Sequence, residues 1–363
     1  AAGGVTSFME MPNTLPPTTT NDLLEEKFRI AAEKSLVNYS FYLGATNNNI
    51  EEIEKINPQR VPGLKLFLGS STGNMLVSES HIIEEIFKKS PVLCAIHSED
   101  DSIISANLNK YKEKYGEDIP FHLHPEIRSA EACFTSTERA VELALKTNCR
   151  LHILHLSTAK ELELLSSKAI SEKQITAEVC VHHLWFNSDD YEKYGAKIKW
   201  NPAIKTEKDR IALIEALKSG KIDIVATDHA PHTLEEKSGN YLKAPSGGPL
   251  VQHSLIAMLE LAQNGHFTIE ELVKYMCHNP AELFKIQKRG FIEENYYADL
   301  VLLDPAQKTN VRSDNILYKC LWSPFEGTGF NSRVQTTFVN GKIVYDNGKI
   351  VENKTAMELK YDR

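Results

Sequence analysis

The chain has 363 residues, of which 42% are hydrophobic and 25% charged, and its formal net charge is −8. This composition is typical of a globular protein, and the scattered acidic excess without a basic block argues against a nucleic-acid surface. No apolar run approaches the roughly 18 residues of a membrane span and no signal peptide is recognisable, so we expect a cytoplasmic protein. The six cysteines are scattered without a CxxC pair, which predicts reduced, mostly buried thiols.

Short apolar runs alternate with segments of helical spacing over the first three quarters of the chain. The predicted strands are Val5–Met11, Val37–Leu43, Gly63–Leu68, Val92–Ile96, Arg150–Leu156, Ile175–His182 and Ile222–Ala226. The predicted helices are Asp22–Ser35, Ile50–Ile56, Glu79–Lys89, Arg128–Lys146, Ala159–Lys168, Glu207–Ser219 and Leu250–Asn264. This alternation is typical of a parallel sheet, and seven strands predict a TIM-like (β/α)8 barrel whose first strand is missing from the chain.

The pattern changes to short strands and tight turns near the C-terminus. Ala298–Asp304 has strand character, and Val334–Val339 and Lys342–Tyr345 flank an Asn-Gly turn, which is the signature of a β-hairpin. We therefore predict two units, a barrel over residues 1–284 and part of a small β-domain over residues 285–363.

Polar side chains gather where the predicted strands end. Asp228 and His232 follow the last barrel strand, His97 ends the fourth and His155 lies at the end of the fifth. Imidazole and carboxylate groups are suitable zinc ligands, and barrel sites are assembled from the carboxyl ends of several strands. His97, His155 and Asp228 are therefore candidate metal ligands.

Other histidines compete for the same role. His152 and His155 lie three residues apart, so on one strand they face opposite sides and only one can point inward. We choose His155, because it lies nearer the strand exit. His122 and His124 belong to a polar insertion, and we expect them at the surface.

Lys65 is a charged residue inside an apolar run, Gly63–Leu68. Burying an ammonium group is costly unless it is paired. Two interpretations remain open. The amine is neutralised by a salt bridge, or it reacts with carbon dioxide to form a carbamate, an anion that can bridge two metal ions.

Taken together, these motifs resemble the amidohydrolase superfamily and, within it, the dihydroorotases. The likeness covers nearly the whole chain. The matching segments are Met11-Pro-Asn-Thr14, Gly63-Leu-Lys-Leu-Phe-Leu-Gly69, Ala95-Ile-His-Ser-Glu99, Ile153-Leu-His-Leu-Ser-Thr158, Asn201-Pro202 and Ala226-Thr-Asp-His-Ala-Pro-His232.

The resemblance implies a zinc-dependent cyclic amidohydrolase that interconverts dihydroorotate and N-carbamoyl-aspartate in pyrimidine biosynthesis, acting on a small-molecule substrate as a homodimer. It implies two Zn²⁺ ions bridged by carboxylated Lys65, with His97 and His155 on one ion. Asp228 would bind the other ion and serve as general base and acid. The implied substrate contacts are Asn13, Asn201, His232, Ser246 and Gly247.

The sequence also departs from the family pattern. The resemblance implies a His-x-His pair, followed by an arginine that binds the substrate, at the end of the first barrel strand. No such pair stands at a strand exit here. We interpret the absence as a missing N-terminal segment; a non-catalytic, dihydroorotase-like scaffold protein is the alternative. Hydantoinase (dihydropyrimidinase) and allantoinase activities share the expected metal site and also stay open.

Overall fold

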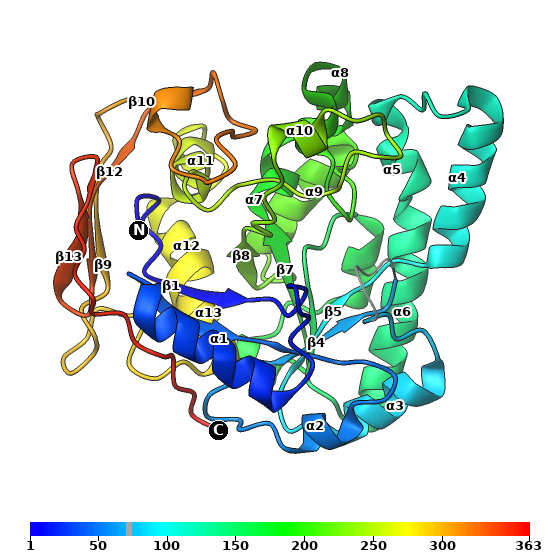
Figure 1. The fold of residues 1–363 in the computed structure, drawn as a ribbon, viewed down its shortest axis with the longest axis horizontal. Helices are drawn as coiled ribbons and strands as arrows, with labels where there is room; N and C mark the ends of the chain where they lie inside the picture. Colours follow the sequence, from blue (N-terminus) through cyan, green and yellow to red (C-terminus); the bar gives the residue numbers. More distant parts are fainter. Residues whose placement is uncertain (70–74) are drawn as a thin grey trace.

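The structure is a computed structural model that describes residues 1–69 and 75–363. A parallel sheet forms its centre (Figure 1). One pair of strands joins β1 to β2, and a six-stranded ladder runs in the order β3-β4-β5-β6-β7-β8. The strands are β1 Ser7–Glu10, β2 Asn38–Phe41, β3 Leu43–Gly44, β4 Leu64–Phe67, β5 Cys94–His97, β6 Leu151–Ile153, β7 Ile175–Cys180 and β8 Ile224–Ala226.

Each predicted barrel strand overlaps an observed one, although β5 and β3 each run one residue past the predicted end, and only Tyr42 separates β2 from β3. Apart from β2 and β3, strands that follow one another in the chain pair in the sheet, and every pair is parallel, with Lys65 opposite Ala95 and Phe67 opposite His97. The carboxyl ends of all these strands therefore lie at one edge of the sheet. Within residues 1–69 and 75–363, no ladder joins β8 to β1.

Helices cover the outside of the sheet, and the apolar core lies between the two layers (Figure 1). Within the described parts of the chain none is long and apolar enough to cross a membrane. The helices are α1 Asn21–Lys34, α2 Ile50–Glu54, α3 Ser80–Lys89, α4 Asp101–Tyr115, α5 His124–Ile127, α6 Ala130–Thr147, α7 Val181–Trp185, α8 Tyr191–Tyr194, α9 Glu207–Lys218, α10 Leu234–Lys237, α11 Ser254–Gln263, α12 Ile269–Val273 and α13 Asn279–Phe284.

The helix predicted over Ala159–Lys168 is wrong. The segment forms only a short 3-10 helix, Lys160–Leu164. Glu161 turns inward, where its carboxylate accepts hydrogen bonds from the Thr137 and Thr158 hydroxyls. Two consecutive serines follow the 3-10 helix, and serine competes with the helical backbone for hydrogen bonds.

A four-stranded antiparallel sheet, in the order β14-β13-β12-β9, lies beside the barrel at the left of Figure 1. Its strands are β9 Leu300–Asp304, β12 Arg333–Val339, β13 Lys342–Asp346 and β14 Lys349–Ile350. The predicted hairpin is confirmed, because Asn340 and Gly341 have φ values of 50° and 79°, as a two-residue turn requires. Beyond this sheet the chain returns to the barrel, where Leu359 N–H donates to the Tyr39 carbonyl. The division of the chain at residue 284 stays a prediction.

Candidate metal and substrate site

The backbone turns sharply at the exits of β6 and β8. His155 has φ 37° and Asp228 has φ 44°, both in the left-handed region that residues other than glycine adopt at a cost. Such backbone strain persists only where the surrounding structure holds it, and it gathers at functional sites. Two of the candidate ligands therefore stand at positions that the fold keeps against local preference.

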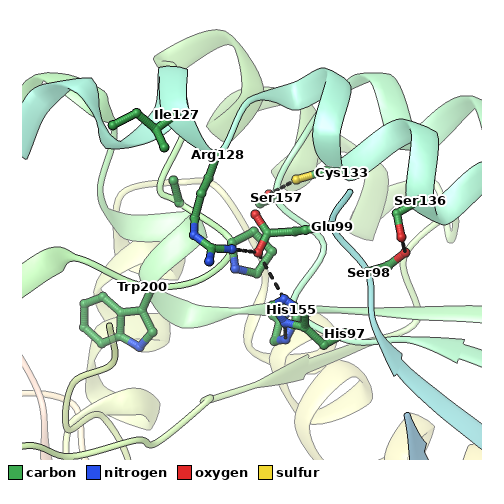
Figure 2. A network of polar contacts seen from close by, with 12 residues as sticks. His97, Ser98, Glu99, Ile127, Arg128, Cys133, Ser136, His155, Ser157 and Trp200 are labelled. Carbon is green, nitrogen blue, oxygen red and sulfur yellow. Dashed lines mark hydrogen bonds and ion pairs between the residues drawn. The ribbon is translucent and has the colours of Figure 1, made fainter. Parts of the chain in front are cut away.

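His97 and His155 face one another across the strand exits (Figure 2). The His97 Nδ1 lies 3.1 Å from the His155 Nε2, and both rings are buried. Burial lowers the pKa of both imidazoles, which favours the neutral form with a free lone pair. Two nitrogens, each about 2.0–2.1 Å from a tetrahedral zinc ion, lie about 3.3 Å apart, so this pair suits one metal ion.

Lys65 on β4 is only 3% exposed. Among the described residues its amine has no hydrogen-bond or ion-pair partner, and it lies 4.3 Å from the centroid of the Phe67 ring. Burial lowers the Lys65 pKa to about 7, against the opposing charges of Asp228 and Glu178. The salt-bridge interpretation is therefore wrong for the described part of the chain, because no carboxylate contacts the amine.

The charges of Asp228 and Lys65 influence one another, although the two side chains form no ion pair. Burial raises the Asp228 pKa to about 7, and the positive charge of Lys65 only partly opposes that shift. A carboxyl group with a pKa near neutrality can both take up and release a proton under ordinary conditions. This is a property that a general base and acid needs.

The predicted substrate contacts differ in how they are held. The His232 side chain is 32% exposed and lines an open pocket of about 360 Å³ together with Tyr318. The Asn201 Oδ1 is buried and has no hydrogen-bond partner among the described residues, whereas Asn13 is exposed in the loop after β1. Gly247 has φ 122° and passes so close to Ala230 that a Cβ would lie 2.6 Å from its carbonyl oxygen.

The loop around Ser246 and Gly247 is held by hydrogen bonds from a buried lysine amine. Lys237 Nζ donates to the carbonyl oxygens of Pro245 and Gly247, each at 2.8 Å. Lys199 Nζ in the same way holds the carbonyl of Ala244 at 2.6 Å. The main chain at the two predicted positions is therefore rigidly placed.

A buried ion pair beside the histidines had no predicted role. Glu99 follows His97 by two residues, its Oε2 lies 3.0 Å from the His97 Nε2, and the same oxygen contacts the Arg128 guanidinium (Figure 2). Arg128 holds the Glu99 pKa at about 2, against the effect of burial. The position of Glu99 at the strand exit was the available signal in the sequence.

Glu178 on β7 was also missed. It is a buried carboxylate inside an apolar run, the same anomaly that singled out Lys65. Its Oε2 lies 3.2 Å from the His152 Nε2, and His152 is fully buried. The choice between His152 and His155 rested on strand alternation, but β6 ends at Ile153, so alternation does not extend to His155.

His124 is not at the surface, contrary to the expectation for the insertion. It is fully buried, and its ring nitrogens contact the Tyr241 hydroxyl at 2.8 Å and the Trp200 carbonyl at 2.6 Å. The insertion after β5 folds into α4 and α5 and packs against the start of α6, so it has a core of its own. His122, in the same insertion, is exposed as expected.

Within residues 1–69 and 75–363, no three side chains drawn from His, Cys, Asp and Glu stand close enough together to hold a metal ion. The donors that do converge are one histidine pair, with the Lys65 amine and Asp228 at longer range. The chemistry of the pair suits a metal, since both nitrogens are neutral donors at a bite distance that zinc accepts.

The family model described as "Amidohydrolase family" matches residues 1–344. The chain belongs to the amidohydrolase family. This membership confirms the predicted α/β barrel with a small β-sheet beside it, and the predicted class of hydrolytic enzyme.

Individual relatives point to two activities within the amidohydrolases. A dihydroorotase of Halobacterium salinarum is 32% identical over 95% of this chain and 79% of its own length. A dihydroorotase of Pyrococcus furiosus is 32% identical over 96% and 75%. Among solved structures, an L-hydantoinase (dihydropyrimidinase) of Arthrobacter aurescens aligns with a TM-score of 0.92 and 30% identity, covering 99% of this chain and 82% of that one.

Proposed function

We propose that this amidohydrolase is a dihydroorotase, which hydrolyses dihydroorotate reversibly to N-carbamoyl-aspartate with two Zn²⁺ ions bridged by carboxylated Lys65. The observation that carries the proposal is the buried Lys65 residue, whose amine has no bonding partner within residues 1–69 and 75–363 and lies near Asp228 and the His97–His155 pair. The names of the relatives supply the substrate.

The state of Lys65 favours the carbamate. A pKa of about 7 leaves a large neutral fraction at physiological pH, and only the neutral amine is a nucleophile. Its lone pair attacks the carbon of carbon dioxide, the new N–C bond forms, and one N–H proton leaves to solvent. The product is an anion with two oxygen donors, and it removes the cost of an unpaired ammonium in an apolar run.

His97, His155 and carboxylated Lys65 would hold one ion, and carboxylated Lys65 and Asp228 would contribute to the other. A bound zinc ion supplies Lewis acidity, which polarises an amide carbonyl. The sequence has no His-x-His pair at a strand exit. The proposal therefore names more protein ligands for the ion at His97 and His155 than for the ion at Asp228.

Asp228 would handle the proton. As the oxygen of water bonds to the ring amide carbon, Asp228 takes the proton of that water. The amide C–N bond then breaks, and Asp228 passes the proton to the departing ring nitrogen. His232, Asn13 and Asn201 would bind the carboxylate and ring of the substrate, together with the main chain at Ser246 and Gly247.

The test compares substrates on one preparation. Purified chain loaded with Zn²⁺ and ¹³C-bicarbonate is assayed with dihydroorotate, hydantoin and dihydrouracil, while metal content and a ¹³C carbamate signal are recorded. The proposal expects a carbamate, bound zinc and a preference for dihydroorotate. Bound zinc with turnover of hydantoin alone would support the proposed metal site but reject dihydroorotate as the substrate.

A preparation with no metal, no carbamate and no turnover would support the scaffold alternative instead. The homodimer is a separate part of the proposal, and light scattering on the same sample measures it. A mass equal to one chain of 40.9 kDa would reject the dimer without touching the chemistry.

A further inference from the structure

We propose that Glu99, held by Arg128, is the positioning residue of His97: it keeps the imidazole proton on Nε2 and thereby directs the Nδ1 lone pair toward His155. The inference rests on the proposed function, because it concerns the orientation of one proposed metal ligand. It assigns a role to an ion pair that neither the predicted ligands nor the predicted substrate contacts include.

The geometry places one carboxylate oxygen between two partners. Glu99 is 0% exposed, and its Oε2 lies 3.0 Å from the His97 Nε2 while it also contacts the Arg128 guanidinium. Figure 2 shows Glu99 between Arg128 and His97, with His155 on the far side of the His97 ring. Among the described residues the His97 Nε2 makes no hydrogen bond of good geometry, so charge and proximity hold its contact with Glu99.

The chemistry of a carboxylate then determines the tautomer. An ionised carboxylate only accepts hydrogen bonds, so the His97 nitrogen that faces it must carry the proton. A neutral imidazole has one N–H, which leaves the lone pair on Nδ1. Nδ1 is the atom that lies 3.1 Å from the His155 Nε2. Metal-binding histidines commonly use a carboxylate on the opposite nitrogen in this way.

The ion pair with Arg128 offsets the free-energy cost of burying the charged Glu99 carboxylate at this place in the fold. Arg128 follows α5 and precedes α6, so the insertion after β5 carries the cation to the strand exit. A buried carboxylate without a partner would take up a proton or destabilise the fold by several kcal/mol. The insertion is thereby coupled to the orientation of His97 through a single ion pair.

The main variant is Glu99→Gln, which keeps the size of the side chain and removes its charge. Because it leaves Arg128 unpaired, a second variant, Glu99→Gln with Arg128→Met, removes both charges and protects the test against a simple folding failure. Glu161→Gln is the matched control: Glu161 is also a buried carboxylate, but it bonds to Thr137 and Thr158 and not to His97.

Two measurements on the full chain are made for each variant. Competition with a chromogenic chelator gives the affinity for Zn²⁺ alone, and we expect a loss of about 10–100-fold in both Glu99 variants and none in the control. In protein labelled with ¹⁵N-histidine, long-range ¹H–¹⁵N spectra report the tautomer of His97, assigned by its disappearance in His97→Asn. We expect Nε2–H in the wild type and a mixed tautomer in the Glu99 variants.

The outcomes separate this inference from the proposed function. A wild-type chain that binds Zn²⁺ while the Glu99 variants retain its affinity and tautomer overturns the positioning role alone. A wild-type chain that binds no Zn²⁺ overturns both proposals. Equal losses in Glu161→Gln would show a general effect of buried charge and would also reject the specific role of Glu99.

Discussion

Each end of β8 has a buried lysine and an aspartate, and the two sets are arranged in opposite ways. Before the strand, Lys173 Nζ lies 2.8 Å from Asp223 Oδ1 and donates to two backbone carbonyls as well. The other Asp223 oxygen accepts the Ala177 N–H at 2.9 Å. After the strand, Lys65 and Asp228 interact through charge without a bond.

The same residue types therefore perform different tasks at the two ends of the barrel. The lower pair is saturated with hydrogen bonds, which is how a buried ion pair contributes to a unique fold. In the part of the chain that the structure describes, the side chains of Lys65 and Asp228 form no hydrogen bond, and Asp228 also has a strained φ. In a barrel the face at the N-terminal ends of the strands (the lower face) serves stability, and the face at their C-terminal ends (the upper face) serves chemistry. Here the number of hydrogen bonds that each charged group makes distinguishes the two faces.

The largest expected effect comes from Asp228→Asn. We expect the rate of dihydroorotate hydrolysis to fall by about 10²–10⁴-fold, because an amide cannot take the proton that a general base removes. The free energy of unfolding should stay the same or rise, because the raised pKa of Asp228 means that the folded site disfavours its charged form, and the variant removes that charge. Steady-state kinetics and urea denaturation on the same preparation measure both quantities. A stable variant with full activity would remove Asp228 from the mechanism.

Lys173→Met should show the reverse behaviour. Breaking a buried ion pair leaves Asp223 uncompensated, which costs about 3–5 kcal/mol of the free energy of unfolding. Activity per folded molecule should be unchanged, because this pair lies at the opposite end of β8 from the strand exits. Replacing both partners, as Lys173→Met with Asp223→Leu, should recover most of the loss. If the single variant lost activity but not stability, the contrast between the two ends would be wrong.

The sequence predicted much of this fold, for identifiable reasons. Apolar runs bounded by turns indicate parallel strands, and an Asn-Gly pair indicates a hairpin, so all barrel strands and the β12–β13 hairpin were found. Spacing alone failed at Ala159–Lys168, where Glu161 turns inward. It also failed at His124, because composition does not reveal that a polar insertion has a core of its own.

The site was predicted less completely than the fold. Strand-exit position identified His97, His155 and Asp228 as candidates, and an ammonium in an apolar run identified Lys65. The partners of those residues, Glu99 above all, depend on which side chains face one another across elements far apart in the chain. A periodic pattern carries no information on such pairs.

A third prediction concerns the unpaired amine itself. In chain prepared without bicarbonate and metal, Lys65→Met should raise the free energy of unfolding by about 1–3 kcal/mol, because an apolar side chain replaces a buried amine that has no partner among the described residues. Denaturation curves of wild type and variant measure the difference, and Lys173→Met is the contrasting control at the other end of β8. Destabilisation of both variants to a similar extent would mean that Lys65 is paired in solution.

The smallest expected effect concerns the hydrogen bond that places His232, one of the proposed substrate contacts at the strand exits. Trp322 is fully buried, and its Nε1 donates to the His232 carbonyl at 2.7 Å, so a residue near the C-terminal sheet helps to place a proposed substrate ligand. Trp322→Phe keeps most of the packing and removes this one hydrogen bond, which is worth about 0.5–1.5 kcal/mol. We expect KM for dihydroorotate to rise by up to about 10-fold with kcat unchanged, because uniform binding is lost and not the proton transfer.

Trp185→Phe is the control, since Trp185 packs against Phe325 without contacting His232. A fall in kcat with KM unchanged would place His232 in the chemical step rather than in binding, and the upper end would then depend on the C-terminal region for catalysis as well as for shape.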